Sequence, residues 1–253
     1  MRALICLFAS IHMFTAWAQD TVTTAPAFIE LGYGYSFNPD GPGRKDNLNQ
    51  MYILGSSFFN KGVNGALRFG VPLNRYSGVA AQYDQSIYFQ AADRILAYYE
   101  TTYTELDFTV EAPPWSISNI QIGPYATYRF RNWSFDAELL FGKSTVKVPQ
   151  LHIRGKKPDF NGFFIFVYRP SQKISVNSVN PSIGARYHFN SSYYWFARAR
   201  MIVNLTDEEE FYYESLYPEI RYYEWHDPVY SFKMDDLYQL GIVTGIGFNL
   251  SGK

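Results

Sequence analysis

The sequence contains a single cysteine, Cys6, and this cysteine lies in a segment that we expect to be removed. Arg2 is followed by an apolar run over 3–14 and then by Ala16-Trp17-Ala18, a pattern typical of a secretory signal peptide. We therefore expect a signal peptide over 1–18 and a single mature domain over 19–253. A mature chain without cysteine is stabilised neither by disulfides nor by a cysteine metal site.

The sequence also lacks a long apolar run, an excess of charge and the usual ligand motifs. After the signal peptide, no stretch reaches the about 18 to 20 consecutive apolar residues that a membrane helix needs. The net charge is -1 and both signs are dispersed, which argues against nucleic acid as a partner. A phosphate-binding glycine loop is missing, and the acidic run 207–211 lacks calcium-loop spacing. We expect no cofactor and no metal.

Aromatic residues, by contrast, make up 19% of the chain, and many lie in segments where apolar and polar residues alternate. Segment 123–142 alternates on both sides of a break at Arg131-Asn132, which predicts a two-stranded hairpin. Segments 67–85 and 183–201 repeat this pattern around short turns that contain asparagine. Together with single alternating strands near the mature N-terminus (29–37) and the C-terminus (239–250), these hairpins predict eight strands.

The segments between the hairpins are long, at roughly 38–62, 90–117, 147–178 and 205–236. Long connections usually argue against strand assignments, but a transmembrane barrel combines short periplasmic turns with long extracellular loops. Residues 52–59 and 102–112 are also strand-like, which leaves ten strands as the alternative. Ten strands would place the turn at 73–76 outside the cell, unlike the other two short turns. We therefore predict an all-β, antiparallel up-and-down barrel of eight strands.

The polar face of the predicted strands carries too much charge for a packed soluble core. We expect this face to line a closed lumen while the apolar face meets lipid. The predicted lumen network contains Glu30, Arg68, Asp84, Arg129, Asp136, Glu138, Arg186, His188, Arg198 and Arg200.

Unpaired charges in such a lumen are costly, so we expect them to form pairs. The predicted pairs are Glu138 with Arg186, Asp136 with Arg129 or His188, and Glu30 with Arg198 or Arg200.

Aromatic residues recur near the short turns of every hairpin. This position predicts an aromatic girdle at the periplasmic interface of the membrane. Its predicted members are Phe69, Tyr76, Tyr128, Phe130, Trp133, Tyr187, Phe189, Trp195 and Phe248.

The signal peptide, the recurring Gly-(Pro/Ala)…Tyr-x-Phe…Asn strand-turn and the ending Gly245-Ile246-Gly247-Phe248-Asn249-Leu250 resemble small bacterial outer-membrane β-barrels of the OmpA/OmpX-like, porin-family type. The resemblance implies an integral outer-membrane protein of a Gram-negative bacterium, in contact with lipid and lipopolysaccharide. The ending is similar to the signal read by the barrel-insertion machinery, although residues 251–253 follow where a terminal aromatic is usual. The resemblance implies no shared function.

The mature chain offers few candidate residues for acid-base catalysis. His152 has no evident acid-base partner, and His226 and Asp227 are adjacent, so on an extended segment they point to opposite sides. Barrel proteases place an Asp and a His two apart on one strand, and barrel lipid A hydrolases need a Ser-His pair facing lipid; neither pattern is evident. We expect no enzyme, and we rank catalysis below channel activity.

Two long loops are unusually aromatic, which indicates a binding surface or loops that pack on one another. The candidate surface contains Phe163, Phe164, Phe166, Tyr212, Tyr213, Tyr217, Tyr222, Tyr223, Trp225 and Tyr230. Function in such barrels usually resides in loops held by a rigid scaffold. We predict a structural or binding role, as a surface interaction protein, an anchor or an accessory subunit, with a protein partner on the loops. A small porin-like channel is the alternative.

Overall fold

The computed structural model of the chain describes residues 25–37, 61–89, 92–157, 164–169, 171–205, 210–214, 229–233 and 239–250. The expected signal peptide (1–18) and the strand-like segment 52–59 lie outside these residues. Within the described residues, no helix has the length and apolar character needed to cross a bilayer.

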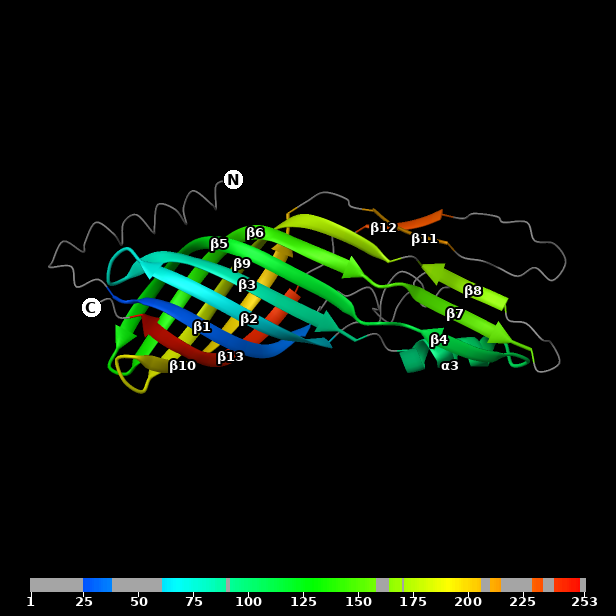
Figure 1. Ribbon diagram of the computed structural model, residues 1–253, viewed down its shortest axis with the longest axis horizontal. Coiled ribbons are helices and arrows are strands. Elements are labelled where there is room, and N and C mark those ends of the chain that lie inside the picture. Colours follow the sequence, from blue (N-terminus) through cyan, green and yellow to red (C-terminus); the bar gives the residue numbers. More distant parts are fainter. Residues whose placement is uncertain are drawn as a thin grey trace.

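Eight antiparallel strands close into a barrel (Figure 1). They are β1 (Ala27–Phe37), β2 (Lys61–Pro72), β3 (Ser77–Tyr88), β5 (Trp115–Phe130), β6 (Trp133–Val148), β9 (Gln172–His188), β10 (Tyr193–Asn204) and β13 (Gln239–Leu250). Their order is β1-β13-β10-β9-β6-β5-β3-β2, and β1 also pairs with β2, so no barrel strand is left as an edge. The prediction of an eight-stranded antiparallel barrel is confirmed, and the ten-stranded alternative is wrong.

Three short turns, at 73–76, 131–132 and 189–192, lie at one end of the barrel, which we call the short-turn end. The asparagine side chains that mark two of these turns hold them closed. Asn74 Oδ1 accepts a hydrogen bond from the backbone N–H of Tyr76 at 2.8 Å, and Asn190 Oδ1 accepts one from that of Ser192 at 2.8 Å. In the tightest turn, Arg131 has a φ of 56°, in the left-handed region that favours glycine or asparagine.

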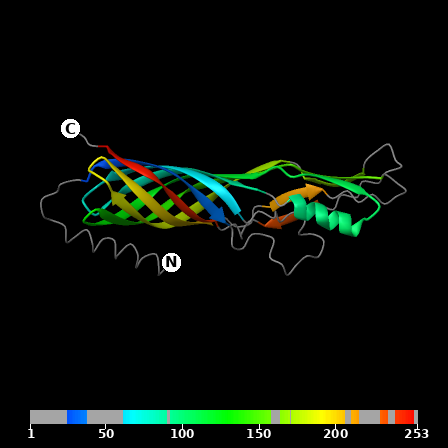
Figure 2. The ribbon, with the colours of Figure 1, turned by 90° about the horizontal axis from the view of Figure 1, so that it is seen from below.

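A second sheet lies beyond the opposite, long-loop end of the barrel (Figures 1 and 2). Its five strands, in the order β12-β11-β8-β7-β4, are β4 (Asp107–Glu111), β7 (Leu151–Lys156), β8 (Phe164–Arg169), β11 (Glu210–Glu214) and β12 (Val229–Lys233). The helix α3 (Ala92–Thr102) packs on β4, where the rings of Tyr99 and Phe108 are 5.3 Å apart. The strand-like segment 102–112 therefore contributes β4 to this outer sheet and does not cross the barrel wall.

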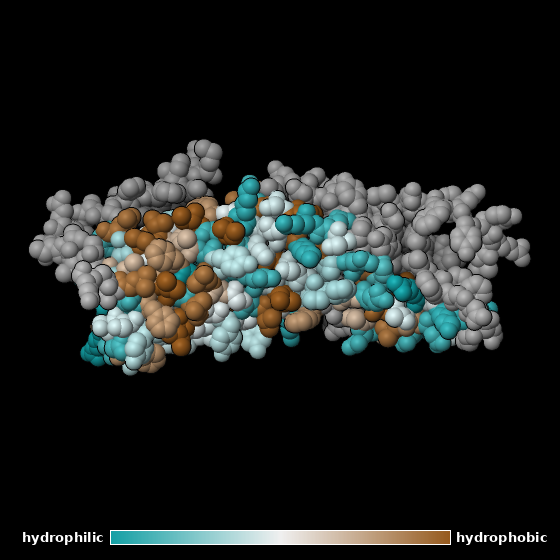
Figure 3. Space-filling view, viewed as in Figure 1, coloured by the Kyte–Doolittle hydropathy of each residue, from teal (hydrophilic) through white to brown (hydrophobic). Residues whose placement is uncertain are grey.

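The outside of the barrel is apolar next to the short-turn end (Figure 3). We call this region the apolar belt; its exposed side chains include Leu31, Leu67, Phe69, Ile120, Ile122, Phe135, Phe141, Ile183, Trp195, Ile242, Ile246 and Phe248. The inward side chains of the same strands include buried carboxylates and guanidinium groups. A soluble protein buries the first set and exposes the second, whereas a barrel that spans a bilayer requires the arrangement seen here.

This polarity reverses toward the long-loop end of β5, β6 and β9. These strands have 16, 16 and 17 residues, whereas the other barrel strands have 11 or 12. Val146 and Val148 of β6 point inward and join a buried apolar cluster that contains Trp115, while Lys143 and Lys147 are exposed. The wall here is built like that of a water-soluble sheet, which suits a position outside the hydrocarbon core of a bilayer.

Candidate functional site

Glu30 of β1 is the centre of the lumen network, and it is 1% exposed. Three guanidinium groups surround its carboxylate: Arg68 Nη1 at 3.0 Å, Arg198 Nη1 at 2.9 Å and Arg186 Nε at 2.9 Å. The Tyr194 hydroxyl also donates a hydrogen bond to Glu30 Oε1 at 3.1 Å. These partners come from β2, β9 and β10, so a single carboxylate connects four strands.

Asp136 and Glu138 lie on the inward face of β6 and complete this cluster. Asp136 pairs with Arg198, and its Oδ1 is 3.3 Å from Arg186 Nε. Glu138 Oε2 is 2.6 Å from Arg68 Nη2, and its Oε1 is 3.4 Å from Arg198 Nε. Each arginine of the cluster therefore contacts at least two carboxylates.

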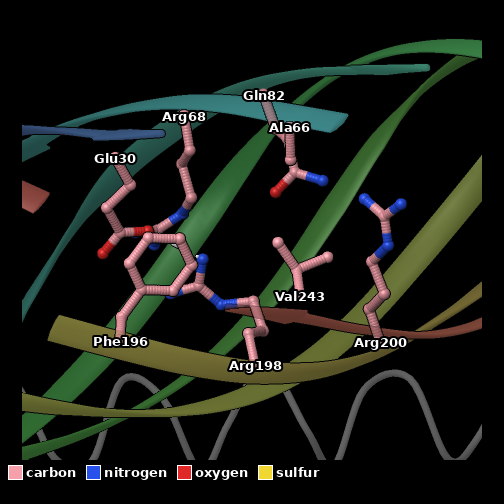
Figure 4. Close-up of a pocket in the computed structure, with 8 residues that line it drawn as sticks. All are labelled: Glu30, Ala66, Arg68, Gln82, Phe196, Arg198, Arg200 and Val243. Carbon is pink, nitrogen blue, oxygen red and sulfur yellow. Dashed lines mark hydrogen bonds and ion pairs between the residues drawn. The ribbon is translucent and has the colours of Figure 1, made fainter. Parts of the chain in front are cut away.

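A second charged group lies farther toward the long-loop end. Arg200 Nη1 is 3.0 Å from Asp84 Oδ2. Asn119 Nδ2 and Gln82 Nε2 donate hydrogen bonds to the two oxygens of Asp84 at 2.7 and 3.1 Å. Figure 4 shows Arg68, Arg198, Gln82 and Arg200 around a small pocket between the two groups, with apolar walls from Phe196, Ala66 and Val243.

The formal charges of the lumen cancel. Four carboxylates (Glu30, Asp84, Asp136 and Glu138) face four guanidinium groups (Arg68, Arg186, Arg198 and Arg200), and all eight residues are buried. An eight-stranded barrel has an interior that side chains can fill. The balanced pairs therefore form a plug with no excess charge to attract ions of either sign.

Aromatic rings cover the charged cluster at the short-turn end. The Phe28 ring lies 4.7 Å from the guanidinium carbon of Arg68 and 4.2 Å from that of Arg186, which are cation–π distances. Gly70 makes room for this ring, because a Cβ at position 70 would overlap it.

The structure brings nine of the ten predicted network residues together inside the barrel, and it corrects the tenth. Arg129 is exposed at the short-turn end, where its Nε donates to the Arg131 carbonyl at 3.4 Å. Its predicted pair with Asp136 is therefore wrong. His188 is buried, but its Nε2 contacts Ser134 Oγ at 2.8 Å, and not Asp136.

Of the other two predictions, the pair of Glu138 with Arg186 is wrong and that of Glu30 with Arg198 is confirmed. Glu138 faces Ser182, which donates to it at 2.6 Å, and its arginines are Arg68 and Arg198 in place of Arg186. The predicted pair of Glu30 with Arg198 is present. Arg200, the other partner considered for Glu30, lies with Asp84 instead.

The predicted lumen network did not include the uncharged polar residues that the structure places in the lumen. Gln121, Asn180 and Ser178 form a chain in which Asn180 Nδ2 donates to Gln121 Oε1 at 2.8 Å, and Gln121 Nε2 donates to Ser178 Oγ at 3.0 Å. All three are buried on the inward faces of β5 and β9. The same alternation that located the charges could have located them, because they occupy the same face.

Eight of the nine predicted girdle residues are exposed on the short-turn half of the barrel, and Tyr187 is half-buried. Tyr187 lies between two other members, with ring centroids 5.0 Å from Trp133 and 5.5 Å from Phe189. Tyr193, whose ring is 6.2 Å from Phe189, extends this aromatic group.

The candidate loop surface is only partly covered by the structure. Phe164 and Phe166 lie in β8, Tyr212 and Tyr213 in β11, and Tyr230 in β12. The remaining members, Phe163, Tyr217, Tyr222, Tyr223 and Trp225, lie outside the described residues. Segments predicted as loops thus contribute strands to the second sheet. In the described part of the chain, no group of three or more His, Cys, Asp or Glu residues is placed to hold a metal ion.

No protein-family model matches the chain, and no curated protein matches its sequence. Solved structures of similar shape include the attachment invasion locus protein Ail of Yersinia pestis, with 12% identity and a TM-score of 0.40 over 89% of this chain and 99% of that one. The outer membrane protein OprG of Pseudomonas aeruginosa has 9% identity and a TM-score of 0.46 over 90% and 98%. The outer membrane protease OmpT of Escherichia coli has 9% identity and a TM-score of 0.42 over 92% and 99%. These likenesses are too distant to transfer a function.

Proposed function

We propose that this chain is an integral protein of a bacterial outer membrane that anchors a protein-binding sheet at the cell surface. The barrel is the anchor, the short-turn end faces the periplasm, and the second sheet projects outward with the long loops. The proposal concerns binding and not catalysis.

The main support for this proposal is that side chains fill the lumen of the barrel. The eight buried charged side chains, together with Gln82 and Asn119, come from seven of the eight barrel strands. They close the interior with ion pairs and hydrogen bonds, among them Arg68 with Glu138 and Arg200 with Asp84. A porin requires a water-filled path, whereas a filled eight-stranded barrel leaves none. The charge balance of the plug supports a rigid scaffold.

The second sheet supplies the surface on which a partner would bind. Its strands β8, β11 and β12 come from the two loops in which aromatic residues are dense. Tyr and Trp provide large contact area at low entropic cost, which favours them at protein interfaces. A sheet held outside the membrane on a rigid barrel would bind a partner in one orientation.

The test is capture of a partner by the full chain from its native membranes in mild detergent. Deletion of 212–230 should abolish co-purification of a stoichiometric protein, while deletion of 40–58, a segment of equal length with fewer aromatics, should not. Both variants must keep the gel mobility shift between unheated and boiled samples that marks a folded barrel. A chain that elutes alone, or a partner retained by the 212–230 deletion, would refute the proposed role of the sheet.

A further inference from the structure

In the barrel strands, the negatively charged side chains all point into the lumen, whereas the charged side chains on the outside are basic. All four carboxylates in the eight strands are the buried lumen groups. The exposed charged residues of these strands are all basic: Lys61, Arg129, Lys143, Lys147 and Lys173. Arg129 is on the inward face beyond the closed lumen, so the outer wall of the described barrel carries four lysines and no negative charge.

Three of these lysines form a group on two neighbouring strands, β6 and β9. Lys147 lies directly opposite Lys173 in the sheet, and Lys143 lies two outward positions below Lys147 on the same strand. Directly opposed side chains in an antiparallel pair have Cβ atoms about 4.5–5.5 Å apart, where like charges destabilise the pair. Among the described residues, no ion pair involves any of the three.

Residues around the three lysines can also donate hydrogen bonds. Thr145 lies between Lys143 and Lys147, while Ser175 and Asn177 lie opposite Thr145 and Lys143 on β9. Their hydroxyl and amide groups share the outer face with the ammonium groups. Such a mixture suits an oxyanion with several oxygen atoms better than it suits an apolar ligand.

The height of this group relative to the apolar belt identifies the kind of oxyanion. A strand rises about 3.4 Å per residue and tilts about 35–45° in a transmembrane barrel, so Lys143 lies roughly 26 Å above Trp133. The apolar band of such barrels is about 25 Å tall. Phe141 is the last belt residue of β6, and Lys143 is the next outward residue. Lys143 therefore lies at the level of the lipid headgroups, and Lys147 and Lys173 lie about 10 Å farther out along the barrel axis.

We propose that Lys143, Lys147 and Lys173 bind the phosphate groups of an anionic lipid in the outer leaflet, such as the lipid A part of lipopolysaccharide. The charge complementarity and the position at the edge of the belt both support this occupant, and the lipid phosphates offset the repulsion between Lys147 and Lys173. The site rests on the membrane placement proposed above, but it is independent of any protein partner on the second sheet.

The test measures the affinity of the full chain, in vesicles of phosphatidylcholine, for added diphosphorylated lipid A. A lysine close to an anionic lipid surface contributes roughly a fivefold change in affinity, so K143Q/K147Q/K173Q should bind roughly a hundredfold more weakly at low salt. The triple arginine variant keeps the charges and should bind as the wild type does. The control R75Q/R129Q/R131Q removes the same charge from the short-turn end and should also retain affinity.

Several results would overturn the site. They are unchanged lipid A affinity in the triple glutamine variant, an equal loss in the short-turn control, and equal affinity for dephosphorylated lipid A. Displacement of lipid A by inorganic phosphate at matched concentration would assign the site to free phosphate and would contradict the lipid. The heat-dependent gel shift shows that each variant is inserted and folded; its absence in the wild type would refute the membrane placement and not the lysine site alone.

Discussion

Arg68 of β2 and Glu138 of β6 meet at 2.6 Å across the interior of the barrel. Strands β3 and β5 separate β2 from β6 in the sheet, so this ion pair spans the lumen and does not follow the wall. Arg68 also contacts Glu30 on the adjacent strand β1 at 3.0 Å. One side chain thus links both sides of the barrel, and its two contacts oppose any change in the cross-section.

Removing the carboxylate of Glu138 should be strongly destabilising. In Glu138→Ala, Arg68 and Arg198 lose a buried partner, and we expect the free energy of unfolding to fall by about 3–5 kcal/mol. Urea unfolding of the chain in vesicles, followed by the gel mobility shift, measures this change. Glu111→Ala is the control, because Glu111 is about half exposed beside Arg154 at 3.7 Å and should cost less than about 1 kcal/mol. Equal losses in the two variants would show that the lumen pairs contribute no more than a surface pair.

The filled lumen predicts a barrel that does not conduct. We expect the reconstituted wild-type chain to produce no discrete current steps in a planar bilayer, because balanced ion pairs block the interior. Reversal of charge in Arg186→Glu should destabilise the barrel without creating ion selectivity. A current through the wild-type barrel whose preference for anions or cations changes in Arg186→Glu would instead favour the porin alternative.

Close approach of two strands makes Gly245 intolerant of a side chain. Gly245 lies opposite Gly32 in the pairing of β13 with β1, and a Cβ there would overlap the backbone carbonyl oxygen of Leu31. We expect Gly245→Ala to lower the free energy of unfolding by about 1–3 kcal/mol, as overpacking does elsewhere.

The matched control for this substitution is Gly65→Ala on β2, where a Cβ meets no atom within 4 Å. This variant should be neutral or slightly stabilising, since it only restricts the unfolded chain. Urea unfolding of the two variants in parallel gives the comparison, and equal stability would exclude strand crowding as the role of Gly245.

The contact between Ser134 and His188 should not make a nucleophile. His188 Nε2 is 2.8 Å from Ser134 Oγ, as in a hydrolase dyad, but within the described residues no carboxylate pairs with the other ring nitrogen. A base without an orienting group activates serine poorly. We expect a fluorophosphonate probe to leave the folded chain unlabelled. Labelling that Ser134→Ala abolishes, in a barrel that still folds, would establish an enzyme.

Alternation in the sequence was sufficient to predict the barrel, because each strand must sort its side chains between lipid and lumen. It placed Glu30, Arg68 and Arg198 on the inward face correctly. It could not predict partners, because the pair of Arg68 with Glu138 depends on barrel closure and on the length of side chains that cross the interior. Arg129 was misassigned because its strand continues past the closed part of the lumen, where an inward-facing residue meets solvent.

The second sheet was harder to anticipate, since its strands are short and pair across large separations in the chain. In β4, Phe108 and Val110 alternate with acidic residues and suggested a strand, yet nothing local shows that β4 pairs with β7 outside the barrel. The helix α3 was not anticipated, and its Tyr99 is buried against β4 through contacts that only the folded chain provides.

The change of polarity along β6 sets the bilayer thickness that this chain tolerates. Trp133 and Phe141 bound its lipid-facing part, and exposed Lys143 and Lys147 follow immediately. A thicker bilayer must either thin around the barrel or draw ammonium groups into hydrocarbon, each at a cost that grows with every ångström of mismatch. The apolar length of β6 therefore matches a thin hydrocarbon core, and the protein should be most stable in a membrane of that thickness.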